Sequence, residues 1–440
     1  MSNLELGIAS LPVLLALIFL RMPIGLAMLG VGMAGTAVAL GGPNIVLAQL
    51  KGQVYSTFSS YSLSIVPLFL LMGQFATLGG MSTSLFKAAE AFLGHRRGGV
   101  AMASIGACAG FGAICGSSLA TAATMGQVAL PEMKRYGYSG GLSTATLAAG
   151  GTLGILIPPS IVLVIYAILT EQNIAKLFLA AFIPGILAAI GYMIVIRILM
   201  ALSPGNAQVK ERMPWGERLV SLASVWPVLA VFILVVGGIY FGWFTPTEAA
   251  AIGAAGTGII AFANGGLSRQ SFADAILKTA QNTGMIFLII LGAAFYNAFL
   301  ALTHVPQEVS NLVVAMDVSP WIILIIVLTI YLVFGCVMDS LSMILLTVPI
   351  FFPIISTLDF GLTPEETAIW FGILVLIVVE VGLITPPVGM NLFVINTMSR
   401  ETRIVDTYKY ILPFVASDII RTAILVAFPA ITLGFMRLIY

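Results

Sequence analysis

The sequence predicts an all-α polytopic membrane protein made of two inverted-topology repeats, each with about five transmembrane helices and one re-entrant hairpin. Three observations predict this fold. The 440 residues are 60% hydrophobic and only 8% charged, whereas soluble domains carry about 25% charged residues. The apolar runs are long and do not alternate with polar residues, which favours spanning helices over a barrel. Short motifs of the first half also recur, in the same order, in the second half.

Ten apolar segments are predicted to cross the membrane, since a span needs about 20 apolar residues. They lie near residues 4–20, 24–41, 63–85, 141–170, 177–200, 219–243, 246–263, 282–300, 366–399 and 411–437. Two of them, 141–170 and 366–399, are overlong and contain Pro-Pro. We expect both to be broken helices, because proline lacks an amide donor and clashes with the preceding turn.

Basic residues predict which loops face the cytoplasm, because Lys and Arg are enriched there. The clusters are Arg21, Lys87 to Arg97, Lys134–Arg135, Lys210 to Arg218, Arg269 to Lys278, and Arg400 to Arg403. Placing every cluster in the cytoplasm gives a self-consistent path with both termini outside. The first apolar run lacks a basic leader, so no cleaved signal is expected.

Two further apolar stretches, 98–132 and 320–357, are predicted to enter and leave the membrane on one side. The first lies between basic loops and is too short for two complete spans. Its polar middle, Cys115 to Ser118, is the expected tip. The second stretch has no basic residue nearby, so it should enter from outside, with its tip at Met338 to Ser340.

Five motif pairs relate the two halves at a nearly constant offset. Gly73 precedes Gly292 by 219 residues, Ser117 precedes Asp339 and Pro131 precedes Pro353 by 222, Pro23 precedes Pro246 by 223, and Pro158 precedes Pro386 by 228. Repeat 1 covers residues 1–200, repeat 2 covers 219–440, and a cytoplasmic linker, 201–218, joins them. Five crossings per half is an odd number, so the second copy is inverted. Inverted repeats with interrupted helices are typical of secondary transporters, whose binding sites lie at the interruptions.

The two tips and two Pro-Pro breaks predict the functional site. Broken helices leave carbonyls free, and carbonyl, hydroxyl and carboxylate oxygens are hard ligands suited to Na⁺. The predicted Na⁺ ligands are Gly116, Ser117, Pro158, Asp339, Ser342, Thr385 and Pro386. The predicted substrate contacts are Ser118, Thr121, Thr152, Ser160, Ser340 and Asn391. The positive ends of the half-helices would face an anionic substrate.

Each of these residues also has a structural interpretation. Asp339 is a carboxylate at membrane depth, which is usually functional, but it could instead cap a helix. Single hydroxyls could bond back to their own helix, and Pro-Pro could merely kink one. Glu248 is expected in a first helical turn, whereas the role of Glu380 is open. Cys108, Cys115 and Cys336 are expected to be packing residues, because no metal or disulfide spacing is present.

Several of these motifs together resemble one transporter family. They are G-S-S-L-A-T-A-A from Gly116, G-G-T-L-G-I-L-I-P-P-S from Gly150, F-T-P-T-E-A-A-A from Phe244, G-C-V-M-D-S-L-S from Gly335 and G-L-I-T-P-P-V-G-M-N from Gly382. They resemble the DctM-type large membrane subunit of tripartite ATP-independent periplasmic (TRAP) transporters, over essentially the whole chain.

The resemblance implies an elevator-type fold of the ion-transporter superfamily in the bacterial inner membrane, with both termini periplasmic. It implies Na⁺-driven import of a small organic acid, such as a C4-dicarboxylate or a sialic acid. A DctP-type periplasmic binding protein would deliver the substrate, and a DctQ-type four-helix membrane subunit would brace the scaffold. No organic cofactor and no nucleic-acid partner are expected.

Three other functions are alternatives for such a sequence. A membrane enzyme is disfavoured, because His95 and His304 are far apart and no nucleophile–base motif is present. A channel is the second alternative, and its flux would show neither saturation nor strict coupling to a cation. A Na⁺/carboxylate symporter that needs no binding protein is the closest alternative. Substrate identity is not predicted, because in a tripartite system the soluble partner would do most of the selection. Thr279 to Ser399 also contains no Lys or Arg that would bind a carboxylate.

Overall fold

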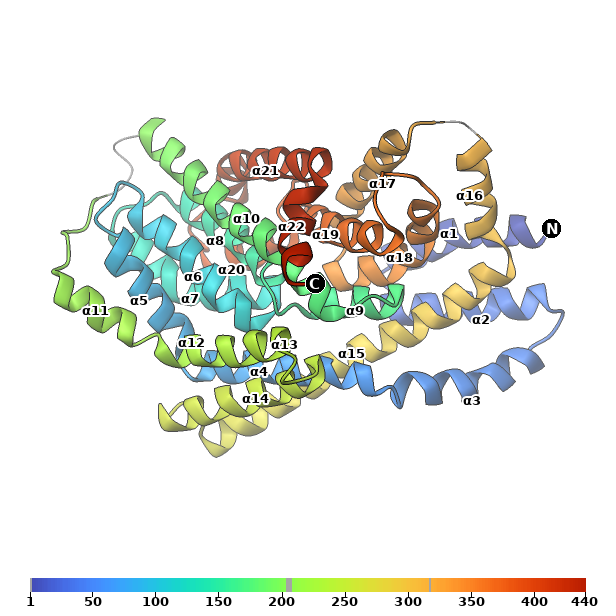
Figure 1. Cartoon of the computed structure of the whole chain (residues 1–440), viewed down its shortest axis with the longest axis horizontal. Coiled ribbons are helices and arrows are strands. Elements are labelled where there is room, and N and C mark those ends of the chain that lie inside the picture. Colours follow the sequence, from blue (N-terminus) through green and yellow to red (C-terminus); the bar gives the residue numbers. More distant parts are fainter. Residues whose placement is uncertain (1, 203–207, 316–317) are drawn as a thin grey trace.

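The computed structural model describes residues 2–202, 208–315 and 318–440, and this part of the chain is helical (Figure 1). The helices of the first half are α1 (Asn3–Phe19), α2 (Ile24–Ala39), α3 (Asn44–Phe58), η1 (Tyr61–Ser64), α4 (Ile65–Leu78), α5 (Met81–Leu93), α6 (Gly99–Cys115), α7 (Ser118–Arg135), α8 (Gly140–Leu156), α9 (Ile161–Thr170) and α10 (Ile174–Leu202). Those of the second half are α11 (Trp215–Ala223), α12 (Trp226–Phe232), η2 (Ile233–Gly237), α13 (Gly238–Tyr240), α14 (Pro246–Ala263), α15 (Arg269–Leu302), α16 (Val305–Ala315), α17 (Pro320–Gly335), α18 (Ser340–Ser356), α19 (Pro364–Gly382), α20 (Met390–Met398), α21 (Ile404–Ala427) and α22 (Pro429–Ile439).

Several helices are long and apolar enough to cross a membrane. Within the described residues, the four continuous candidates are Tyr61–Leu78, Ile174–Leu202, Arg269–Leu302 and Ile404–Ala427. Two bent pairs also qualify: α8 with α9, at 43°, and Trp215–Ala223 with Trp226–Tyr240, at 45°. The chain is therefore a multi-pass membrane protein. The count of ten crossings stays a prediction, because several other apolar helices are shorter than one span.

Three predicted segments were wrong as continuous helices. The segment 219–243 is bent by 45° where α11 ends at Ala223 and α12 begins at Trp226. The segment 411–437 is divided where α21 ends and α22 begins at Pro429, whose missing amide proton suits a first helical position. The segment 63–85 ends at Leu78, and Gly80 then adopts a φ of 69°, which glycine tolerates without steric cost. Helices α3, α5 and α16 were not predicted at all. Part of the predicted linker, residues 203–207, lies outside the described residues.

Both expected hairpins and both expected breaks are present as helix pairs. Helices α6 and α7 turn at Gly116, whose φ is 63°. Helices α17 and α18 turn just before Asp339. The Pro-Pro sequences separate α8 from α9 and α19 from α20.

Packing between the two halves is reciprocal. Helix α2 lies along α15, and α4 lies along α14. Helix α7 contacts α20, and α18 contacts α9. Figure 1 shows α15 as a long diagonal helix that reaches from beside α14 to beside α2. A two-fold repeat requires such pairs of equivalent contacts, in which corresponding helices of the two halves change places. The inversion itself stays a prediction.

Glycine pairs bring each hairpin against the broken helix of its own half. A Cβ on Gly112 would lie 2.5 Å from Cα of Gly154, and a Cβ on Gly382 would lie 2.5 Å from the carbonyl carbon of Gly335. Only residues without a side chain allow this backbone approach. The contacts therefore set the distance between each tip and the neighbouring break.

Candidate functional site

A cavity of about 280 Å³ lies between the two hairpin tips. Polar residues from both tips line it: Gly116, Ser117, Ser118, Asp339 and Ser340. The opposite lining comes from α4 and α15: Leu70, Asn282, Met285 and Ile286. The cavity thus lies at a boundary between the hairpins and the α4–α15 pair.

Each tip begins its second helix with a polar cap. The Ser117 hydroxyl accepts a hydrogen bond from the amide of Ala120 at 3.4 Å. The Asp339 carboxylate accepts one from the amide of Ser342 at 3.1 Å. Such caps satisfy an amide that has no partner within the helix. Asp339 is therefore a helix cap, and it also lines the cavity.

Glu380 connects the two tips. This residue lies on α19 just before the second break and is 1% exposed. Its carboxylate accepts a hydrogen bond from Ser340 at 2.6 Å and another from the hydroxyl of Ser118. Those serines are the first residues of α18 and α7, at matching positions of the proposed repeat. One buried carboxylate therefore holds corresponding residues of both hairpins.

The sequence contained a signal for Glu380, although its role was left open. It is a lone acid within the apolar run of α19, and such residues usually face a polar interior. Its partners are hairpin residues distant in the chain, so no local pattern could identify them.

Three of the remaining predicted residues bond to the backbone around the breaks. Ser160 caps α9 through the amide of Leu163, at 3.3 Å. The Thr385 hydroxyl, just beyond the end of α19, donates to the carbonyl of Val381 in the last turn of that helix. The Asn391 amide donates to the carbonyl of Ala148 at 3.3 Å. Pro158 and Pro386 begin the Pro-Pro sequences and do not line the cavity.

Two buried oxygens near the breaks lack a hydrogen-bond partner among the described residues. They are Oγ1 of Thr121, on α7, and Oδ1 of Asn391, on α20. Gly154 lies on α8 just before the first break. A Cβ at this position would collide with the Thr121 oxygen and lie 2.7 Å from the carbonyl oxygen of Ser117. These two oxygens of the first hairpin therefore lie next to the first break. Buried oxygens without a hydrogen-bond partner are uncommon in proteins, and oxygen is the type of ligand that a hard cation takes.

Thr152 points toward a different polar cluster. Its hydroxyl lies 3.0 Å from the hydroxyl of Tyr192, which donates to Asp418 at 2.7 Å. Asp418 forms an ion pair with Arg421 at 2.9 Å, and both side chains are buried. Thr152 therefore contacts α10 and α21 through this cluster and does not line the cavity.

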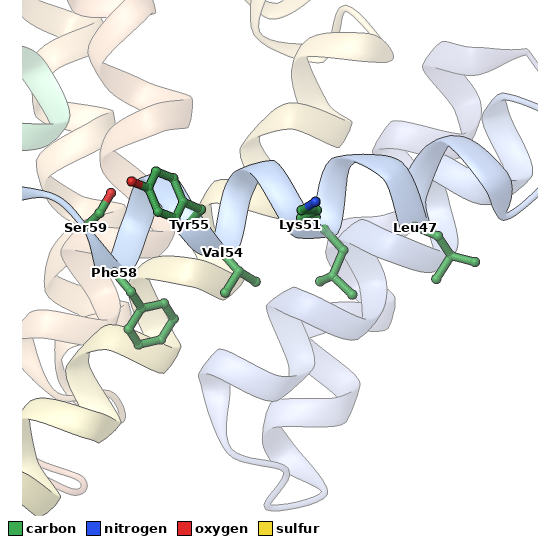
Figure 2. A pocket seen from close by; sticks show the side chains of 7 residues that line it. Leu47, Lys51, Val54, Tyr55, Phe58 and Ser59 are labelled. Carbon is green, nitrogen blue, oxygen red and sulfur yellow. The ribbon is translucent and has the colours of Figure 1, made fainter.

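A larger hollow on α3 is unrelated to the predicted site. It measures about 630 Å³ and is lined by residues of α3 and by Ser59, which directly follows this helix. Figure 2 shows Leu47, Val54 and Phe58 along one side of this helix, with Lys51 between them. These residues recur at helical spacing, so they form one largely apolar face. No predicted site residue contributes to it.

The sequence matches a known family over most of its length. Residues 11–431 match the model of the tripartite ATP-independent periplasmic transporter, DctM component. The C4-dicarboxylate TRAP transporter large permease protein DctM of Pseudomonas aeruginosa is 36% identical over 387 residues, which cover 88% of each chain. The isethionate TRAP transporter permease protein DctMQ of Oleidesulfovibrio alaskensis is 31% identical over 97% of this chain and 66% of its own.

One solved structure has a similar fold. The Alcanivorax borkumensis YdaH transporter aligns with a TM-score of 0.61 over 88% of this chain and 89% of its own. Its sequence identity is 16%, so the likeness concerns the fold alone.

Proposed function

The chain belongs to the DctM component family of tripartite ATP-independent periplasmic transporters, and from this premise we propose that it imports a small organic-acid anion by Na⁺-coupled transport. It is a TRAP transporter large permease. The observation that carries the proposal is the cavity between the tips, where both hairpins meet at Glu380.

The geometry supports an elevator-type movement. The hairpins and broken helices contact one another through their glycines and through Glu380. Leu70 of α4 and three residues of α15 line the same cavity as the hairpin tips. A unit of hairpins and broken helices that moves against these two helices would carry the cavity with it, and we assign the scaffold to α2, α4, α14 and α15.

We propose that helix termini and Na⁺ compensate the charge of the substrate. No Lys or Arg lies among the residues that line the cavity, and Asp339 adds a negative charge. Helices α7 and α18 both begin at this cavity, and the N-terminus of a helix attracts anions. Bound Na⁺ at the tips would offset Asp339 and allow an anion to enter. The need to offset this negative charge before the anion binds gives a physical reason for coupling substrate transport to Na⁺.

The substrate is proposed as a small organic acid, of which C4-dicarboxylates and sialic acids are the examples expected from the sequence. The two relatives described above are named for a C4-dicarboxylate and for isethionate. Both are compact anions, which suits a cavity of about 280 Å³. A DctQ-type membrane subunit and a DctP-type periplasmic protein are the proposed partners, and the inner membrane is the proposed location.

Uptake into proteoliposomes tests the proposal. The chain would be reconstituted with its membrane subunit and binding protein, and radiolabelled succinate and isethionate would be the first substrates. We expect accumulation with an inward Na⁺ gradient and almost none when K⁺ replaces Na⁺. Undiminished uptake without Na⁺ would refute the coupling. Equal uptake without the binding protein would instead support the independent symporter.

A further inference from the structure

A second cavity, of about 380 Å³, lies where the α5–α6 connection meets the C-terminal end of α10. It is lined by Arg96, Arg97, Met102, Arg197 and Ala201. The connection packs closely on α10, because a Cβ on Gly98 would lie 2.9 Å from Cγ of Met200. Three guanidinium groups therefore line one cavity at the end of a candidate membrane span.

The positive charge of this cavity is not neutralised within the described part of the chain. None of the three arginines forms an ion pair there. Glu90, the acidic residue of α5, pairs with Lys210 at 3.0 Å. Residues 203–207, outside the described part, contain no acid in the sequence. The three arginines would repel one another unless an anion lies between them.

Neighbouring residues add to the positive potential. His95 directly precedes the arginines, and its ring lies 3.5 Å from the guanidinium of Arg218. Burial lowers the pKa of His95, and the charges of Arg218, Arg212 and Arg96 lower it further. A lowered histidine pKa is the expected response to positive charge nearby.

An apolar face of α10 leads into the cavity. Ile190, Ile194, Arg197 and Ala201 are spaced by four, three and four residues, so they lie on one side of the helix. Ile190 and Ile194 are 48% and 52% exposed, and Ile186 extends this side by one more turn. A ligand with a phosphate and two acyl chains could place its phosphate on the arginines and its chains on the isoleucines.

We propose that this cavity binds the headgroup phosphate of an anionic phospholipid, with the acyl chains lying along Ile186, Ile190 and Ile194 of α10. Guanidinium groups bind phosphate through paired hydrogen bonds. Basic pockets between membrane helices are typical sites for anionic headgroups on the cytoplasmic side, which is the side predicted for the cluster at Lys87 to Arg97. Inorganic phosphate offers the same charge, but it would leave the apolar face unused.

Native mass spectrometry of the full chain in detergent tests this site. The chain would be titrated with dioleoylphosphatidylglycerol, with dioleoylphosphatidylcholine, and with inorganic phosphate. We expect retained phosphatidylglycerol adducts and weaker binding of phosphatidylcholine. The variant Arg96→Gln/Arg97→Gln/Arg197→Gln should weaken phosphatidylglycerol binding on the order of a hundredfold, at roughly fivefold for each charge removed near the membrane surface.

A matched variant controls for total charge. Arg269→Gln/Lys278→Gln/Lys409→Gln removes three basic residues that also lack an ion pair in the described residues. It should bind phosphatidylglycerol like the wild type. Equal losses in both triple variants, or equal affinity for the two lipids, would overturn the proposal. Displacement of the lipid by millimolar inorganic phosphate would assign the site to free phosphate and overturn the phospholipid. If the triple variant is misfolded by circular dichroism, Arg197→Gln alone is compared with Lys409→Gln.

Discussion

Removing the hydroxyls that bond to Glu380 tests whether this residue holds the two hairpins together. Ser118→Ala and Ser340→Ala each delete one hydrogen bond to a buried carboxylate. A hydrogen bond to a charged group contributes about 1.5–3 kcal/mol. We therefore expect each single variant to lower the free energy of unfolding by about that amount.

The double variant should lose more than the sum of the two single variants. After one substitution, Glu380 still accepts a hydrogen bond from the other serine. After both, a carboxylate that is 1% exposed has lost both hydroxyl donors, and an uncompensated buried charge is strongly destabilising. We expect a coupling energy of about 1–2 kcal/mol, within the usual range for residues that share a partner. Glu380→Gln should be milder than Glu380→Ala, because an amide can still accept from one serine.

Equilibrium unfolding in mixed dodecyl maltoside–SDS micelles, followed by circular dichroism, measures these free energies. Ser143→Ala is the matched control. Ser143 is a buried serine of α8 whose hydroxyl donates only to the carbonyl of Ser139, the N-cap residue of the same helix, so its loss should cost under about 1 kcal/mol. Single variants that unfold like this control, together with an additive double variant, would refute the idea that Glu380 holds the tips.

Three further predictions concern the glycine contact, the cap of the second tip and the buried ion pair. Gly382→Ala places a Cβ 2.5 Å from the backbone of Gly335 and should destabilise by about 1–3 kcal/mol, whereas Gly284→Ala, with open space at its Cβ, should be neutral in the same unfolding assay. Asp339→Asn keeps a capping side chain but removes the charge. We expect Na⁺ to raise the thermal midpoint of the wild type above its value in K⁺, and this increase should be absent in the variant, whose midpoint in K⁺ should be nearly unchanged. A retained Na⁺ response would exclude Asp339 as a ligand. Asp418→Leu leaves Arg421 buried and unpaired and should cost about 3–5 kcal/mol, and adding Arg421→Met should recover part of that loss; a double variant no more stable than Asp418→Leu would argue against the ion pair.

The positions of the tips and breaks could be predicted because their signals are local. Polar residues such as Ser117 and Asp339 interrupt long apolar runs, and Pro-Pro ends a helix wherever it occurs. The family could also be predicted, because its motifs contain these interruptions together with the surrounding residues. The structure has two helices at each of these four places, whereas the re-entrant course of the hairpins stays a prediction.

Other features could not be predicted from a search for apolar spans. Helix α3 contains Lys51 and several polar residues, so its apolar content falls below that of a span. The division between α21 and α22 was missed because Phe428 and Pro429 lie in an apolar run. A single proline is tolerated within many membrane helices, as at Pro184 of α10, so composition alone cannot distinguish a kink from an end.

The proposed repeat explains why the two halves of the site differ. At the offset that relates the Pro-Pro breaks, Glu380 corresponds to Thr152. Thr152 contacts Tyr192, so the first half supplies no carboxylate at this position. Glu380 instead bonds to the corresponding serines of both hairpins. A symmetric pair of carboxylates would place two like charges in a small volume, which is costly away from water. A single shared carboxylate avoids that repulsion and makes each tip depend on the other, so cation binding at one tip should alter the geometry of both.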